Sequence, residues 1–129
     1  MISIQQGNAR WDLHHSSLAS ALHPAQARFD AITPDFKDTA SLLNCCDLLI
    51  TIDTSVAHLG GALGLPTWVM LKCHPSWQWG EFGQETPWYS SVRCFRQHIP
   101  FDWSGVIADV DKSLKNWIDH WFRFRNTDL

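Results

Sequence analysis

One short stretch of this sequence places an acid, two hydroxyl residues and a histidine at a spacing that suits ligand binding. It is Asp53-Thr-Ser-Val-Ala-His58, which directly follows the apolar run 47–52. A buried strand followed by a helix is predicted here, so Thr54 and Ser55 fall at the first turn of the helix. The backbone N–H groups of that turn lack helical partners and lie at the positive end of the dipole. We therefore predict a diphosphate-binding turn formed by Asp53, Thr54, Ser55, Val56, Ala57 and His58.

The same stretch also has a purely structural interpretation, which the residues alone leave open. Asp, Thr and Ser commonly precede a helix because their side chains cap its first turn, and His58 can satisfy a buried carbonyl. A hydrolase triad of Asp53, Ser55 and His58 is disfavoured, because triad residues usually come from distant positions and no G-x-S-x-G is present. Asp109 and Asp111 form a D-x-D in a predicted helix, where residues two apart do not face each other. We predict no catalytic residue among these sets.

The flanking segments predict an open parallel α/β sheet, Rossmann-like, with helices on both faces. Apolar runs indicate strands and helical spacing indicates an amphipathic C-terminal helix. Strands are expected at 47–52, 67–71 and 93–96, and helices at 55–63 and 106–121. Gly64 and Pro66 mark the end of the first of these helices. Weaker patterns predict strands at 1–5 and 28–32, a helix capped by Asp38, and a loop with one helical turn at 72–91.

Length and composition narrow the class of protein. The 129 residues fit one domain, 1–129, and 45% hydrophobic with 18% charged residues is ordinary for a globular chain. A net charge of -3 argues against a nucleic-acid partner. The four cysteines form no CxxC and the histidines have no metal spacing, so we expect reduced thiols and no metal site. With no signal peptide and no membrane-spanning stretch, a cytoplasmic location is expected.

Several ordered motifs resemble the C-terminal half of family 9 glycosyltransferases, the heptosyltransferase-like group. The variety joined to tetratricopeptide repeats in bacteria is the most similar. The central motif runs from Asp47 through D-T-S-V-A-H to Trp68. The others are S-I-Q-Q-G at 3–7, F-K-D-T-A at 36–40, W-Q-W at 77–79, P-W-Y-S at 87–90, R-C-F-R-Q at 93–97 and D-W at 102–103. Together they cover nearly the whole chain.

This resemblance implies one half of a GT-B fold that binds the nucleotide-sugar donor of a glycosyltransferase. In such enzymes the element matching residues 53–58 cradles the donor phosphates, without a metal or other cofactor. The resemblance also places further residues beside the nucleotide: Gln6, Gly7, Lys37, Asp38 and Thr39. The matched motifs belong to one half only, so we expect little transfer by this chain alone. Three alternatives stay open: a truncated gene product, a fragment, or one piece of a two-chain enzyme in which a separate chain supplies the other half. Gln78 stands where the family commonly carries arginine.

A non-catalytic role is the alternative. In that case the chain is a relic or an interaction module that keeps the fold, and its uncovered apolar face predicts self-association as a homodimer.

Overall fold

The computed structural model describes residues 1–8, 10–30 and 35–125, and it divides the chain into two compact units, Met1–Leu42 and Leu43–Leu129. The first unit contains three short helices, α1 (Arg10–His14), η1 (Ser17–Ala21) and α2 (Gln26–Asp30), and most of α3 (Phe36–Leu43). The second contains β1 (Leu49–Ile52), α4 (Ser55–Ala62), β2 (Thr67–Leu71), η2 (Trp77–Trp79), β3 (Val92–Arg96) and α5 (Ser104–Arg125). The prediction of one domain over 1–129 stays a prediction.

In the first unit, the predictions of strands at 1–5 and 28–32 are wrong for the residues that the structure describes. Residues 1–5 form no strand, because the buried Gln26 side chain bonds the backbone where a neighbouring strand would. The Gln26 Oε1 accepts from Ser3 N at 2.8 Å, and its Nε2 donates to Ser3 O at 3.0 Å. Residues 28–30 lie in α2, since Gln, Ala and Arg favour a helix; 31 and 32 lie outside the described residues.

The start of α3 is an acidic capping box rather than a cap by Asp38 alone. The Asp38 N–H donates to Asp35 Oδ1 at 2.8 Å, and the Asp35 N–H donates to Asp38 Oδ2 at 3.2 Å. This reciprocal pair satisfies two donors at the helix start. The helix therefore begins at Phe36, earlier than a cap at Asp38 implies.

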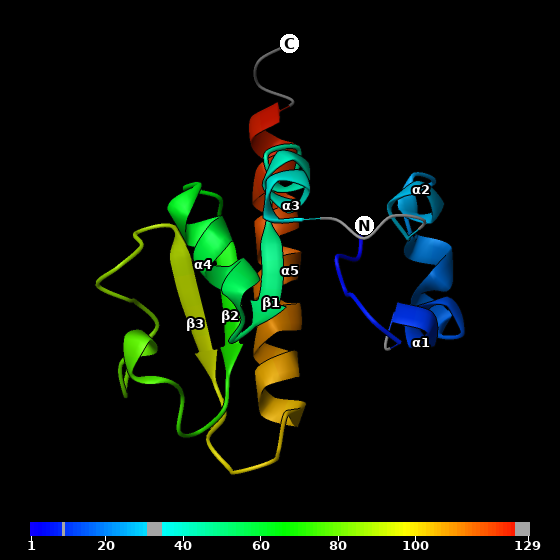
Figure 1. Ribbon diagram of the computed structural model, residues 1–129. Coiled ribbons are helices and arrows are strands. Elements are labelled where there is room, and N and C mark those ends of the chain that lie inside the picture. Colours follow the sequence, from blue (N-terminus) through cyan, green and yellow to red (C-terminus); the bar gives the residue numbers. More distant parts are fainter. Residues whose placement is uncertain (9, 31–34, 126–129) are drawn as a thin grey trace. The chain divides into compact units, whose positions relative to one another are not determined.

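The second unit confirms the predicted fold class. Its three strands are parallel in the order β1-β2-β3, with Leu49 opposite Thr67 and Thr67 opposite Val92. Figure 1 shows α4 and α5 on opposite sides of this sheet. The arrangement is an open Rossmann-like α/β sheet.

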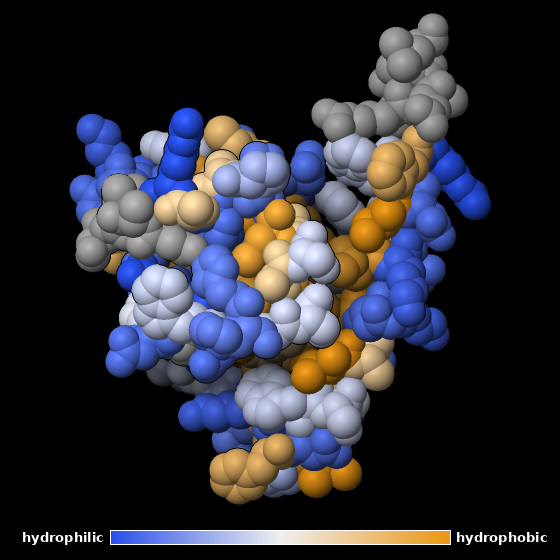
Figure 2. Space-filling view, turned by 90° about the vertical axis from the view of Figure 1, so that its right-hand side faces the viewer, coloured by the Kyte–Doolittle hydropathy of each residue, from blue (hydrophilic) through white to orange (hydrophobic). Residues whose placement is uncertain are grey.

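The side chains of β2 alternate between the two faces of the sheet and contribute to a hydrophobic core on each face. On the α4 side, Val69 and Leu71 pack with Ala57 and Trp79, and on the α5 side Trp68 packs with Phe95, Val106 and Val110. Successive strand residues point to opposite faces, so one strand anchors both helices. Figure 2 shows the same division along α5, with hydrophilic side chains (blue) on its outer edge and hydrophobic ones (orange) toward the sheet.

Two backbone turns are held by left-handed residues. Gly64, at φ 70°, ends α4, and its N–H donates to Gly61 O at 3.1 Å, which confirms the predicted stop. Phe101 is the one described non-glycine residue with a positive φ, at 65°, in the turn between β3 and α5. Its side chain is 95% exposed, so packing does not compensate for this strained backbone.

Close approach of α4 to the sheet makes Gly60 sensitive to substitution. A Cβ at Gly60 would lie 2.5 Å from Thr67 Oγ1 and 2.7 Å from Leu49 Cδ2. We expect Gly60→Ala to lower the free energy of unfolding by about 1–3 kcal/mol, because it overpacks a buried contact. The measurement is urea unfolding followed by circular dichroism.

The matched control for Gly60→Ala is Gly105→Ala in α5. A Cβ there meets nothing within 4 Å, so the substitution is expected to be neutral or to stabilise the helix. Equal losses of stability in the two variants would contradict the close-approach explanation.

Candidate functional site

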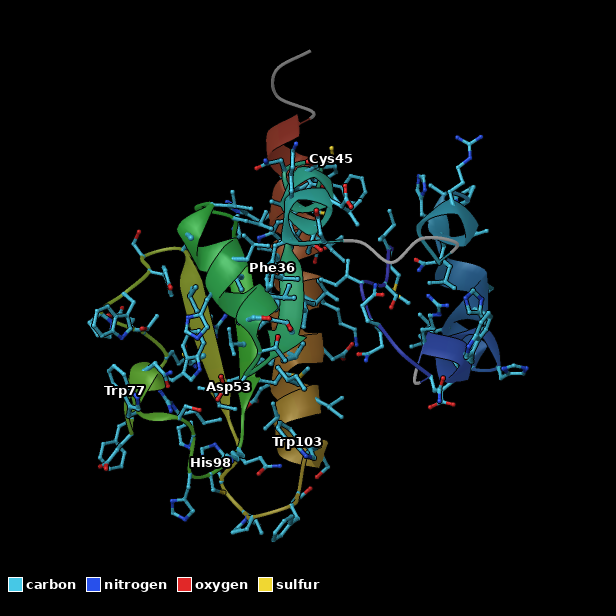
Figure 3. The ribbon with its side chains drawn as sticks, viewed as in Figure 1. Phe36, Cys45, Asp53, Trp77, His98 and Trp103 are labelled. Carbon is cyan, nitrogen blue, oxygen red and sulfur yellow. The ribbon has the colours of Figure 1, made fainter. Side chains whose placement is uncertain are left out.

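The predicted turn lies at the carboxyl edge of the parallel sheet, where ligands bind in open α/β folds. Asp53 and Thr54 follow β1 directly, and α4 begins at Ser55. Lys72 follows β2 at the same edge and is exposed. Figure 3 shows Asp53 at this end of β1, with Trp77 on the loop that follows β2.

The Asp53 carboxylate is engaged by that loop. Its Oδ2 accepts a hydrogen bond from Ser76 Oγ at 2.7 Å, and its Oδ1 accepts one from Trp79 Nε1 at 2.7 Å. Both bonds are charge-assisted and short. Asp53 therefore ties the end of β1 to η2, and it does not cap α4.

These contacts determine the ionisation of Asp53. Burial alone would raise the pKa of this carboxyl, but the hydrogen bonds from Trp79 and Ser76, together with the nearby His58, hold the pKa below its ordinary value. The acid is therefore ionised at neutral pH, and its charge is stabilised by the donors around it.

His58 is held from two directions by aromatic residues. Its ring stacks on Trp79 with centroids 4.7 Å apart and planes 23° apart, and its Nδ1 lies 3.2 Å from Tyr89 Oη. Gly61, one turn further along α4, leaves room for Tyr89, since a Cβ there would lie 2.5 Å from its ring. Trp79 is thus shared: its indole N–H bonds Asp53 and its face contacts His58.

Arg96 holds the other side of the same loop. Its guanidinium donates to the backbone oxygens of Trp79 at 2.5 Å, Gly80 at 2.9 Å and Gly83 at 2.7 Å. Gly80 and Gly83, which supply two of these carbonyls, both have positive φ, a conformation that glycine adopts readily. Residues 76–83 are consequently held by the carboxylate of Asp53, which follows β1, and by the guanidinium of Arg96 in β3.

The first turn of α4 is open by comparison. Thr54 is its N-cap residue, but its side chain makes no capping bond; Thr54 Oγ1 lies 3.4 Å from Ile52 O instead. Ser55 is exposed and Val56 partly so, whereas Ala57 is buried and its N–H donates to Thr54 O at 3.0 Å. Side-chain capping by Thr54 thus finds no support in the described contacts. The first backbone N–H groups of a helix have no helical partners, so those of this turn are available to a ligand.

The remaining predicted residues lie in the first unit. Gln6 and Gly7 precede α1, and Lys37, Asp38 and Thr39 lie in the first turns of α3. The Asp38 carboxylate and the Thr39 hydroxyl, which donates to Asp35 O at 2.9 Å, are used in the start of that helix. That these residues border a nucleotide stays a prediction.

Sequence reasoning missed the supporting roles of Ser76, Tyr89 and Arg96. The W-Q-W and P-W-Y motifs drew attention to the segments but not to the bonds, which join residues 13 to 31 positions apart. In the parts of the chain that the structure describes, no three His, Cys, Asp or Glu residues gather as a metal site requires. No described helix is long and apolar enough to cross a membrane.

Comparison with known proteins gives one distant relative. Protein FlbA of Caulobacter vibrioides is 25% identical over 117 residues, which is 90% of this chain. The chain spans about a fifth of that relative, 19% of its length. No family model and no solved structure matches the chain.

The Asp53 network gives a prediction about stability and pH. An Asn side chain is neutral and has one acceptor oxygen, so it cannot accept both hydrogen bonds that the Asp53 carboxylate accepts. Asp53→Asn should therefore lower the free energy of unfolding by about 1–2 kcal/mol at neutral pH. Because folding lowers the pKa of Asp53, its stabilisation is present above the ordinary value of about 3.9 and is lost as the pH falls below it. The difference in free energy of unfolding between the parent chain and Asp53→Asn should therefore be smaller below the ordinary pKa of Asp than at neutral pH. Urea unfolding at neutral and at acidic pH measures this difference.

The control for this experiment is Asp111→Asn. Asp111 lies in an exposed pair with Lys115 at 2.6 Å, which contributes little to stability. A deficit of Asp53→Asn that stays constant from neutral pH to acid would show that the loss is not linked to the charge of Asp53.

Proposed function

We propose that this chain binds the diphosphate of a nucleotide sugar, as the donor-binding domain of a glycosyltransferase. The observation that carries the proposal is the uncapped first turn of α4 at the carboxyl edge of a parallel sheet. Amides and hydroxyls of Thr54, Ser55 and Val56 are the phosphate ligands, and the helix dipole favours negative charge there. Lys72 supplies a cation at the same edge.

In this proposal Asp53 and His58 position the site rather than grip the phosphate. Both oxygens of Asp53 accept bonds from the loop, and the His58 ring is held by Trp79 and Tyr89. An acid beside a diphosphate is tolerated because its charge is already stabilised by two donors. The resemblance to family 9 glycosyltransferases supports the sugar-nucleotide class, and the fold and the turn are consistent with it.

The direct test uses proline at position 55, the first residue of α4. Proline is tolerated at this position because the first N–H of a helix has no helical partner, and Thr54 at φ −144° and ψ 168° already has the extended backbone that precedes proline. Ser55→Pro thus removes an amide and a hydroxyl donor while keeping the helix. We expect UDP, ADP or GDP to bind with a dissociation constant on the order of 0.1–1 mM and the variant to bind about tenfold more weakly.

The measurement is an NMR amide titration of the labelled chain with each nucleoside diphosphate. Ser55→Ala is the matched variant, since it removes the hydroxyl alone and should lose less affinity than Ser55→Pro. Shifts clustered at 53–60 are the expected result. Equal affinity of Ser55→Pro and the parent chain would exclude the first turn of α4 as the phosphate site.

A second candidate is a self-associating interaction module. Large apolar side chains of the second unit are exposed, among them Trp77 at 78%, Phe82 at 85% and Phe101 at 95%. In addition, α5 has 22 residues, roughly 33 Å of helix, and extends beyond the strands in Figure 1. Exposed apolar surface of this kind favours association between copies.

For this second candidate the expected result is a homodimer. Light scattering across a concentration series should give a mass near twice 14.8 kDa at high concentration. Trp77→Ser should shift the equilibrium toward monomer, because it removes exposed apolar surface. A monomeric mass at every concentration would rule this candidate out.

A further inference from the structure

A second polar site lies on the opposite side of the sheet from α4, between the edge strand β3 and α5. It is an open pocket of about 300 Å³. Phe95 is its one apolar lining residue, and the others are polar or charged. The lining residues are Gln84, Arg93, Phe95, Asp109, Lys112, Ser113 and Asn116.

Arg93 is held in place within this pocket. Its Nε donates to Gln84 Oε1 at 3.1 Å, and its guanidinium carbon lies 4.6 Å from the centre of the Phe95 ring. Gln84 is itself fixed, because its backbone oxygen accepts from Cys94 N at 2.8 Å. Only the Nε of Arg93 is used in these contacts, so the two terminal nitrogens present a fork of fixed orientation, which suits two oxygens of one anion.

The charges of the pocket are not neutralised by one another. Among residues 35–125, no ion pair within 4.0 Å involves Arg93, Asp109 or Lys112, although Lys115 pairs with Asp111 at 2.6 Å on the same helix. The pocket holds two cations and one acid, so its local charge is positive in a chain of net charge -3. A concave surface lined by excess charge of one sign concentrates ligands of the opposite sign.

We propose that this pocket binds a small oxyanion that also carries hydroxyl groups, such as a sugar phosphate or a sugar acid. Arg93 and Lys112 contact the oxyanion, and Asp109, Ser113 and Asn116 bond the hydroxyl groups. The pocket is separate from the turn at 53–58, so it is a second site and not part of the proposed donor site. The phosphate ester and the carboxylate share the same recognition chemistry, and the experiment distinguishes them.

The test is an NMR amide titration of the whole chain with glucose 6-phosphate, glucuronate, inorganic phosphate and glucose. We expect shifts at 93–95 and 109–116 with glucose 6-phosphate or glucuronate, with a dissociation constant on the order of 1 mM. Inorganic phosphate should bind more weakly because it lacks the hydroxyl contacts, and glucose should produce no shifts in this range because it lacks the anion. The better of the two anionic sugars identifies the oxyanion.

Variants distinguish the pocket from general attraction of anions. Arg93→Lys keeps the charge but removes the fork, and Lys112→Gln removes a charge; each should weaken binding about tenfold. Lys115→Gln is the matched control, since Lys115 lies on the same helix outside the pocket and should leave affinity unchanged.

Three outcomes would overturn the proposal: no shifts at 93–116 at about 20 mM ligand, equal loss in Lys112→Gln and Lys115→Gln, or phosphate alone binding as tightly as either sugar. Shifts at 53–60 with nucleoside diphosphates are read from different amides, so each site can fail independently.

Discussion

The second unit depends on one ionised carboxylate that organises a long irregular loop. Asp53, at the end of β1, accepts hydrogen bonds from Ser76 and Trp79, and Arg96, at the end of β3, donates to three carbonyls of the same segment. A loop of this length has a high conformational entropy, and these charge-assisted bonds offset its ordering. With the loop fixed, Trp79 can be buried beneath His58 and complete the core on the α4 side.

The residues of the Asp53–His58 turn therefore have two different roles. The side chains at its two ends, Asp53 and His58, bond the loop, while the residues between them leave the first turn of α4 uncovered. A phosphate placed there would meet backbone amides whose direction is set by the helix, so little reorganisation would accompany binding. In the pocket beside Arg93 the two cations lie at the ends of long side chains, and Arg93 is restrained there by Gln84 and Phe95.

Much of the second unit could be predicted from local pattern. The apolar residues 67–71 gave a strand with the bounds that the structure has, and Gly64 marked the end of α4, because both signals are local in sequence. The strand predicted at residues 1–5 was wrong because it rested only on the alternation of apolar and polar residues. In the structure the side chain of the distant Gln26 bonds the backbone of Ser3 instead.

The strand, turn and helix around residues 53–58 were predicted correctly, but the contacts of the turn were not. The turn at 53–58 was found because strand, helix and polar residues are adjacent in the chain. That Asp53 serves the loop instead of the helix depends on Ser76 and Trp79, more than twenty residues away. No spacing rule specifies such a contact, and the Arg93 pocket likewise joins β3 with α5 across a turn.

The turn at Phe101 is a favourable site for cleavage by a protease. The loop at 76–83 is long but is bonded at both ends, so a protease cannot readily draw it into an extended conformation. Phe101 combines near-complete exposure with a strained backbone, and aromatic side chains are the preferred sites of chymotrypsin-like enzymes. Within the second unit, chymotrypsin would therefore cut after Phe101 more readily than after the exposed Phe82. Such a cut leaves α5 attached to the sheet through contacts such as those of Val106 and Val110 with Trp68 and Phe95.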